Sequence, residues 1–353
     1  MSLLFSPFQL RGVTFANRIA LSPMCQYSAV DGVAGAWHLA HYGARMIGGA
    51  GLVMLESTAV SAAGRITPGC LGLWNDAQEE ALRALVAQGH ALGVRMGVQL
   101  NHAGRKGSVQ VPWHGGQALA AEHGAWPVPA PSAEHQGAGL SLPYAMGEQD
   151  IRAVVGEFAS AAARAVRCGF DVVELHAAHG YLLHQFLSPL SNHRQDAHGG
   201  DFAGRTRFTR EALAAMRAVL PDSMPLFVRL SCTDGAPGGW TLDESVRLAQ
   251  ELRAGGADLI DCTSGGIAAA QPRPAGVAFN AEAAQRVATE AAISTATVGG
   301  IADASQAEQV LARGQADLLF LGRALLADPF WPLRARRALG AAETPPQYQR
   351  ATF

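Results

Sequence analysis

Two histidines and a tyrosine follow a single apolar run and have the chemistry to act together on one small molecule. The run Val172–Leu175 is typical of a buried strand, and His176, His179 and Tyr181 come directly after it. Imidazole and phenol groups that leave one strand end together can donate hydrogen bonds to an electron-poor oxygenated molecule and can protonate it. A lone histidine at such a place is more often a core or turn residue, but the cluster favours a catalytic site.

Glycines and an arginine lie at two later strand ends, where they could bind a phosphate. Gly299 and Gly300 follow one apolar run, and Gly322 and Arg323 follow the next. Backbone N–H groups of glycines approach an anion closely, and an arginine guanidinium adds a fork of donors. The alternative is that Gly299 and Gly300 form only a tight turn.

Gln99 and Arg229 lie on further apolar runs and suit an organic cofactor. Gln99 offers a donor and an acceptor together, which matches the edge of a pyrimidine-like ring. Arg229 offers a permanent cation for an anion that forms and disappears. Flavin mononucleotide (FMN) satisfies both residues and the phosphate site, because its reduced ring carries negative charge near N1. Gln99 could instead be an interior polar residue bonded to backbone.

These residues need a scaffold that brings the ends of many strands together. Short apolar runs alternate with Ala-rich helical stretches, which predicts an α/β protein with a single (β/α)8 barrel and catalytic residues at the C-terminal strand ends. A doubly wound sheet would need a Gly-x-Gly-x-x-Gly turn after an early strand, and the sequence has none there. The predicted strands are 19–22, 52–55, 95–100, 172–175, 226–230, 259–262, 294–298 and 318–321. The predicted helices include 76–91, 149–168, 242–254 and 305–313.

Three segments decorate this one predicted domain, which covers residues 1–353. Residues 5–18 are predicted to form a small hairpin that plugs the bottom of the barrel. Residues 103–147 form a long loop after strand three, and a loop of this length inside a compact domain usually has a function such as that of a lid. Residues 341–353 form an extended tail, since two consecutive prolines stiffen it.

The composition argues against several classes of function. The net charge of −2 provides no basic surface for nucleic acid or an anionic membrane, and no apolar run is long enough to span a bilayer. The five cysteines are an odd number without a Cys-x-x-Cys pair, which argues against a disulfide scaffold and favours a reducing cytoplasm. The only lysine is Lys106, which we interpret, with Arg105, as a solvated loop charge. Zinc at His176 and His179 would lack a third ligand, so no metal is predicted.

With these motifs the sequence resembles the Old Yellow Enzymes, which are FMN-dependent ene-reductases, over essentially its whole length. It is most similar to the bacterial branch that reads Pro-Met-Cys-Gln-Tyr after the first strand. Departures from the family pattern at His198, Asp201 and Gly204 concern a supporting loop. The motifs that carry the resemblance are 17–19, 22–27, 102–105, 174–181, 192–196 and 322–323.

The resemblance implies a role for each residue of the site. Tyr181 would deliver a proton, His176 and His179 would bind the activating oxygen of the substrate, and Tyr27 would contact the substrate. The residues that would contact FMN are Ser22, Pro23, Met24, Cys25, Ala59, Gln99, Arg229, Gly299, Gly300, Gly322 and Arg323. Cys25 either tunes the flavin or only packs against it.

The resemblance also implies the reaction and the assembly. NADPH or NADH would reduce FMN, and the substrate would be an activated alkene such as an enone, enal, nitroalkene or maleimide. A homodimer or a dimer of dimers would form, with Arg350 of the tail reaching into a neighbour's active site. Two other classes remain open: a phosphate-binding barrel isomerase or lyase without redox chemistry, and a flavin carrier, which would leave Tyr181 without a role.

Overall fold

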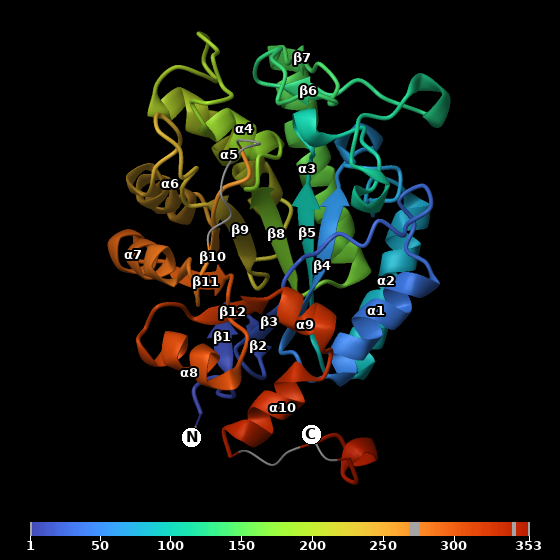
Figure 1. Cartoon of the computed structure of the whole chain (residues 1–353), viewed down its shortest axis with the longest axis vertical. Helices are drawn as coiled ribbons and strands as arrows, with labels where there is room; N and C mark the ends of the chain where they lie inside the picture. Colours follow the sequence, from blue (N-terminus) through green and yellow to red (C-terminus); the bar gives the residue numbers. More distant parts are fainter. Residues whose placement is uncertain (1, 268–274, 341–343, 352–353) are drawn as a thin grey trace.

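Eight parallel strands close into a barrel in the computed structural model, which describes residues 2–267, 275–340 and 344–351 (Figure 1). Neighbours in the barrel follow the order of the sequence, and the last barrel strand pairs with the first. The predicted (β/α)8 barrel is therefore confirmed. The barrel strands are β3 (Ile19–Leu21), β4 (Leu52–Ala59), β5 (Arg95–Asn101), β8 (Val172–Ala177), β9 (Leu226–Ser231), β10 (Leu259–Thr263), β11 (Ser294–Val298) and β12 (Leu318–Leu321).

The barrel strands read as short apolar runs because both of their faces are covered. Every residue of β4, β8, β9, β10 and β12 is buried, as expected for parallel strands between a packed interior and an outer ring of helices. The register places polar residues of neighbouring strands side by side: Gln99 is opposite Glu174, and Arg229 is opposite both His176 and Asp261.

The helices begin where capping residues occur in the sequence. Asn75 accepts a hydrogen bond from the backbone of Gln78, and Thr241 accepts one from Glu244, so each satisfies an N–H group of a first turn. The helices predicted at 76–91 and 242–254 have these bounds, and the other two differ by one residue at their ends. The helices are α1 (Ala36–Ile47), α2 (Asp76–Ala91), α3 (Glu148–Cys168), α4 (Leu182–Leu187), α5 (Phe202–Arg217), α6 (Leu242–Ala254), α7 (Ala281–Ala291), α8 (Ala304–Ala312), α9 (Arg323–Ala327) and α10 (Trp331–Ala338).

The predicted hairpin consists of β1 (Phe8–Leu10) and β2 (Val13–Phe15), which pair antiparallel. Val13 and Phe15 belong to one buried cluster with residues of the barrel strands, among them Phe227, whose ring centroid is 6.5 Å from that of Phe15. The hairpin thus closes the N-terminal end of the barrel, and this leaves the C-terminal end for a site.

The loop at residues 103–147 rises above the C-terminal ends of β4 and β5 (Figure 1). It is built from three 3-10 turns and one pair of very short parallel strands. The turns are η2 (Gly104–Lys106), η3 (Pro112–His114) and η4 (Ala121–His123), and the strands are β6 (Pro129–Ala130) and β7 (Tyr144–Ala145).

The C-terminal tail lies at the other end of the molecule. Its described part, residues 344–351, forms a 3-10 turn, η5 (Pro346–Tyr348), where we predicted an extended segment; residues 341–343 and 352–353 lie outside the described chain. The Tyr348 ring packs at 5.6 Å from the Phe330 ring, which gives this part of the tail a local partner. In the described part of the chain, no helix has the length and apolar character to cross a membrane.

Candidate active site

A cavity of about 730 Å³ opens at the C-terminal ends of the barrel strands, and it gathers predicted site residues from five separate segments. The predicted residues that line it are Met24, His179, Arg229, Gly299, Gly300, Gly322 and Arg323. Residues that we did not predict complete the wall, and they include Thr263, Phe279, Asn280 and Trp331. The barrel therefore brings the predicted phosphate residues and one predicted catalytic histidine to the same space.

Gly299 and Gly300 occupy backbone conformations that few other residues adopt, with φ of +118° and +70°. A Cβ atom at Gly299 would lie 2.3 Å from the Phe279 ring, and one at Gly300 would lie 1.9 Å from the carbonyl oxygen of Gly276. Packing of residues 276–279 thus accounts for both glycines by itself. It also leaves this wall of the cavity without side chains, as close approach of an anion requires.

Arg229 lies deep in the barrel with only 3% of its surface exposed. Its two terminal nitrogens each lie 3.3 Å from the Ser22 hydroxyl. Its Nε is 3.1 Å from a carboxylate oxygen of Asp261, but the alignment is too poor for a hydrogen bond, so this contact is an ion pair. We did not single out Asp261 from the sequence. Its ion pair with Arg229 holds the guanidinium beside the cavity.

Gln99 donates a hydrogen bond of 2.7 Å to Glu174, which is fully buried on the adjacent strand. Burial raises the pKa of Glu174 to about 8, and the charge of Asp261 adds to the rise, while Arg229 and Gln99 oppose it. Burial raises the pKa of Asp261 as well. A buried carboxyl group near a second acidic group resists ionisation, so the raised pKa favours a proton on Glu174 near neutral pH.

His176, His179 and Tyr181 converge, as predicted. The His176 ring centroid is 5.2 Å from that of His179 and 5.0 Å from that of Tyr181. The Nδ1 atom of His176 accepts a hydrogen bond from the backbone N–H of Ala178 at 3.2 Å, so the proton of the neutral ring is on Nε2. His179 contacts the hydroxyl of Thr263 through Nε2 at 3.0 Å.

The electrostatics keep both imidazoles neutral. Burial lowers the pKa of His176 and of His179 well below the usual value, and the positive charge of Arg229 lowers both further. Burial also raises the pKa of Tyr181 well above its usual value. The imidazoles can therefore act as neutral hydrogen-bond donors, and the phenol stays protonated until it meets a strong base.

Tyr27 and Cys25 lie beside Tyr181 in a cluster that the long loop covers. Cys25, Tyr27, Tyr181 and Leu140 of the loop pack on the same small buried cluster, and the Trp113 ring lies 5.9 Å from the ring of Tyr27. Burial raises the pKa of the Cys25 thiol, so Cys25 is a neutral thiol at physiological pH. The loop that we predicted as a lid therefore contacts the predicted substrate residue Tyr27 and shares a cluster with the predicted proton donor Tyr181.

Lys106 corrects one interpretation of the sequence. It is not a solvated charge, because its Nζ lies 2.7 Å from the carbonyl oxygen of His179 and also contacts the carbonyl oxygen of Gly266. Arg105 is likewise buried. Burial lowers the pKa of Lys106 to about 8, with Arg105 adding to the effect. Because Gly266 is distant in the sequence, only the fold reveals this contact.

Three predicted residues have other surroundings. Pro23 lies half-buried in the segment that follows β3. The backbone N–H of Ala59 donates to Leu71 at 2.9 Å and its carbonyl accepts from Leu73 at 3.0 Å, so a contact of Ala59 with a flavin stays a prediction. Arg350 is exposed on the tail, and the chain does not bring it to the cavity that holds the other residues.

Comparison with known proteins agrees with this geometry. Residues 3–341 match the NADH:flavin oxidoreductase / NADH oxidase family. The chain is 42% identical to an NADPH dehydrogenase of Listeria innocua, with 99% of each chain covered. It is 44% identical to an NADH:flavin oxidoreductase of Gibberella zeae, over 92% of this chain and 83% of the relative.

Solved structures give the same result for the fold. The structure of morphinone reductase superimposes with a TM-score of 0.79 and 29% identity, and covers 98% of this chain and 91% of the reductase. The family match spans the barrel and every cavity residue described above. The chain therefore belongs to the NADH:flavin oxidoreductase / NADH oxidase family, that of Old Yellow Enzyme, and is an NAD(P)H:flavin oxidoreductase.

Proposed function

We propose that the protein is an FMN-dependent ene-reductase that uses NADPH or NADH to reduce activated alkenes. The observation that carries this proposal is the group formed by His176, His179 and Tyr181, in which two neutral imidazoles and a protonated phenol lie together and His179 lines the cavity. Such a group suits a substrate that must be polarised at an oxygen and protonated at a carbon.

The residues around the cavity fit FMN. Arg229 supplies a buried positive charge, which suits a ring system that gains negative charge on reduction. The bare wall at Gly299 and Gly300 and the exposed guanidinium of Arg323 suit a phosphate. Gln99 retains its carbonyl oxygen and one N–H for a polar ring edge, since only one N–H is engaged by Glu174.

The protein residues bind and polarise the alkene. The redox chemistry, in which a hydride is taken from NAD(P)H and passed to the β-carbon of the alkene, is supplied by FMN when it is bound. His176 and His179 donate hydrogen bonds to the carbonyl or nitro oxygen and stabilise the charge that develops there. Tyr181 gives its proton to the α-carbon and regains one from solvent. The alkene thus gains a hydride and a proton, and NAD(P)H becomes NAD(P)+.

The cofactor assignment is tested by the protein as purified. We expect a yellow protein with one FMN per chain, measured from its absorbance and from the flavin released on denaturation. Replacing Arg323 by Ala should release much of the FMN. Arg313→Ala, at the C-terminal end of α8 and outside the cavity lining, should not. Full FMN occupancy in Arg323→Ala would contradict the phosphate site, and a colourless protein would favour an isomerase or lyase.

We further propose that the enzyme is a dimer or a dimer of dimers in the cytoplasm. Arg350 is exposed and lies away from the cavity of its own chain, which leaves it available to the active site of a neighbouring subunit. All five cysteines are free thiols, which suits a reducing compartment. No nucleic acid or membrane partner is proposed, since the net charge is −2.

A further inference from the structure

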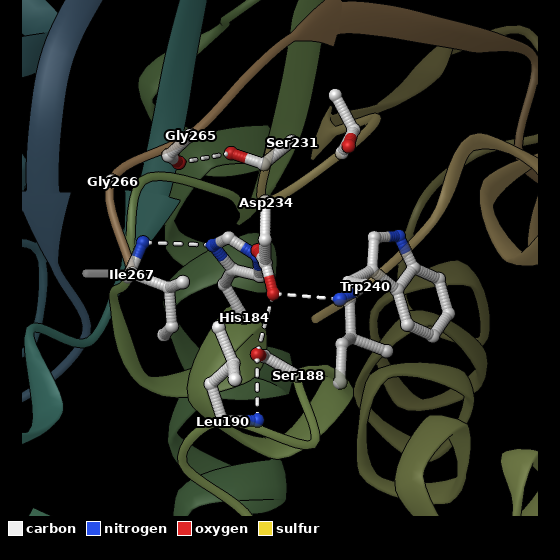
Figure 2. Close-up of polar contacts among 12 residues, drawn as sticks. His184, Ser188, Leu190, Ser231, Asp234, Trp240, Gly265, Gly266 and Ile267 are labelled. Atoms are coloured by element: carbon white, nitrogen blue, oxygen red, sulfur yellow. Dashed lines mark hydrogen bonds and ion pairs between the residues drawn. The ribbon is translucent and has the colours of Figure 1, made fainter. Parts of the chain in front are cut away.

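A buried hydrogen-bonded pair, His184 and Asp234, adjoins the proposed site but has no part in the chemistry described above. Nε2 of His184, on α4, lies 2.9 Å from a carboxylate oxygen of Asp234, and both side chains are fully buried. The other oxygen of Asp234 accepts hydrogen bonds from the Ser188 hydroxyl at 2.6 Å and from the backbone of Trp240 at 2.7 Å (Figure 2). Burial alone would raise the pKa of Asp234, but its hydrogen bonds and the proximity of His184 hold it below the usual value.

The hydrogen bonds of His184 fix which ring nitrogen carries the proton. Its Nδ1 accepts a hydrogen bond of 2.8 Å from the backbone N–H of Gly180. A backbone N–H can only donate, so Nδ1 is unprotonated and the proton of the neutral ring is on Nε2, facing Asp234. Asp234 therefore holds His184 in the one tautomer that can bind Gly180.

Gly180 is the residue between His179 and Tyr181, and its backbone is held on both sides. Its carbonyl oxygen accepts a hydrogen bond of 2.7 Å from Gln185, the residue that follows His184 on α4. The turn is left-handed, with φ of +58° at His179 and +71° at Gly180. Such a backbone is unfavourable for histidine and persists only where its surroundings enforce it.

We propose that Asp234 and His184 are positioning residues of the alkene site, which act through the Gly180 N–H to aim His179 and Tyr181 at the same substrate. This inference rests on the proposed ene-reductase function. Loss of the hydrogen bond frees the turn to relax, which moves the imidazole and the phenol relative to one another. Arg229, Gly299 and Gly300, which would hold the flavin, lie on other segments, and we expect them to stay in place.

The substitution Asp234→Asn tests the pair with almost no change in shape. The amide oxygen can take the place that accepts from Ser188 and Trp240, which turns the amide N–H2 toward His184. His184 must then accept at Nε2 and carry its proton on Nδ1, where it meets the N–H of Gly180. The variant thus breaks the Gly180 hydrogen bond through the tautomer of His184.

The kinetic readout compares two acceptors at the same flavin. After reduction by NADPH, we expect 2-cyclohexenone to reoxidise the flavin of Asp234→Asn about a hundredfold more slowly than in the unchanged enzyme, since small misplacements of reacting groups cost about this much. Reoxidation by molecular oxygen needs neither His179 nor Tyr181. Misplacement of these groups should therefore change its rate by less than about twofold. A matched control is Ser245→Ala, which removes the hydroxyl that accepts a hydrogen bond of 2.6 Å from the indole N–H of Trp240 in the same region. Among the described residues no hydrogen bond joins Ser245 to Gly180, so both rates should stay unchanged.

A second readout does not depend on activity. Hydrogen exchange at the Gly180 amide, followed by mass spectrometry of a peptide across residues 179–183, should be slow in the unchanged holoenzyme and in Ser245→Ala, and fast in Asp234→Asn. Fast exchange in the unchanged protein would overturn the proposal even if the variant fails to fold. Unchanged exchange, or equal slowing with both acceptors, would also overturn it. An unchanged enzyme that ignores the enone would instead refute the proposed function.

Discussion

At the scale of residues, the site is an arrangement of neutral donors beside a buried cation. Burial and the charge of Arg229 keep His176 and His179 neutral. Each ring therefore has one N–H donor and carries no charge. The raised pKa of Tyr181 makes the phenol a weak acid. In the proposed reaction it would therefore protonate a strongly basic carbon, such as one formed by hydride transfer.

Replacing His179 by Ala should slow the reduction of an enone far more than the reduction of molecular oxygen. Losing one strong donor at a developing oxyanion costs about 3 kcal/mol, or roughly a hundredfold in rate. We expect the variant to reduce 2-cyclohexenone about this much more slowly, with oxygen consumption nearly unchanged, measured by stopped-flow absorbance and an oxygen electrode. Equal slowing in both assays would count against the role of His179 as a donor to the substrate.

The raised pKa of Glu174 should appear in the pH dependence of stability. Burial raises the pKa of Glu174 to about 8, and an unfolded glutamate has a pKa of about 4.3. The folded protein therefore holds a proton that the unfolded chain has lost, and stability falls as pH rises through this window and levels off above the folded pKa.

The substitution Glu174→Gln should remove this fall. We expect the difference in melting temperature between Glu174→Gln and the unchanged protein to shift in favour of the variant from pH 6 to pH 9. Gln at this position can still accept the hydrogen bond from Gln99. The matching variant Asp261→Asn shows whether the proton is on the other carboxyl group. A difference that stays constant with pH would contradict a buried proton on these carboxyl groups.

At the scale of elements, the loop at residues 103–147 is the predicted lid, and it contacts the predicted substrate residue Tyr27. Trp113, on η3, packs edge-on against Tyr27 at 5.9 Å. An aromatic pair of this kind contributes about 0.5–1.5 kcal/mol. We expect Trp113→Ala to raise the KM for enones about two- to tenfold by this measure, with little effect on the reduction of the flavin by NADPH.

Trp126 provides a control on the same loop. Its indole donates to the carbonyl of Ala63 and lies near the Arg65 guanidinium. Trp126→Ala should change the thermal stability of the loop more than the KM for enones. A KM that is unchanged in Trp113→Ala, or raised equally in both variants, would show that the loop is not a lid of the substrate site.

The positions of the strands and helices could be predicted from the sequence, but most contacts between them could not. Each barrel strand is buried on both faces, so it appears as an apolar run, and caps such as Asn75 and Thr241 mark helix starts. The same runs contain Glu174 and Asp261, and their carboxyl groups are the signal that could have revealed the charged interior. The contacts of Lys106 and of His184 depend on loops far apart in the sequence, and no local pattern encodes them.

At the scale of the whole molecule, the barrel separates two ends with different tasks. The hairpin of β1 and β2 closes one end, and the described part of the tail lies beside a second cavity of about 640 Å³ near the starts of β3, β4 and β5. The proposed active site occupies the other end. A tail that contributes to catalysis must therefore do so in a neighbouring subunit, which links the proposed assembly to the proposed function.

Two changes to the tail separate assembly from catalysis. Deleting residues 346–353 should raise the KM for enones and weaken self-association in sedimentation, because it removes Arg350 and the packing of Tyr348 on Phe330. Arg350→Ala should raise the KM without a change in size, since it leaves that packing intact. Unchanged kinetics and unchanged size in the truncated protein would refute the contribution of the tail in trans.

The most direct test of the central claim is an anaerobic titration of the purified protein in two steps. Addition of NADPH should bleach the flavin absorbance, and addition of 2-cyclohexenone should then restore it, with one cyclohexanone formed for each NADPH consumed. Tyr181→Phe should bleach normally and recover slowly, because the proton donor is missing. A protein without flavin absorbance, or a bleached flavin that the enone fails to reoxidise, would contradict the account.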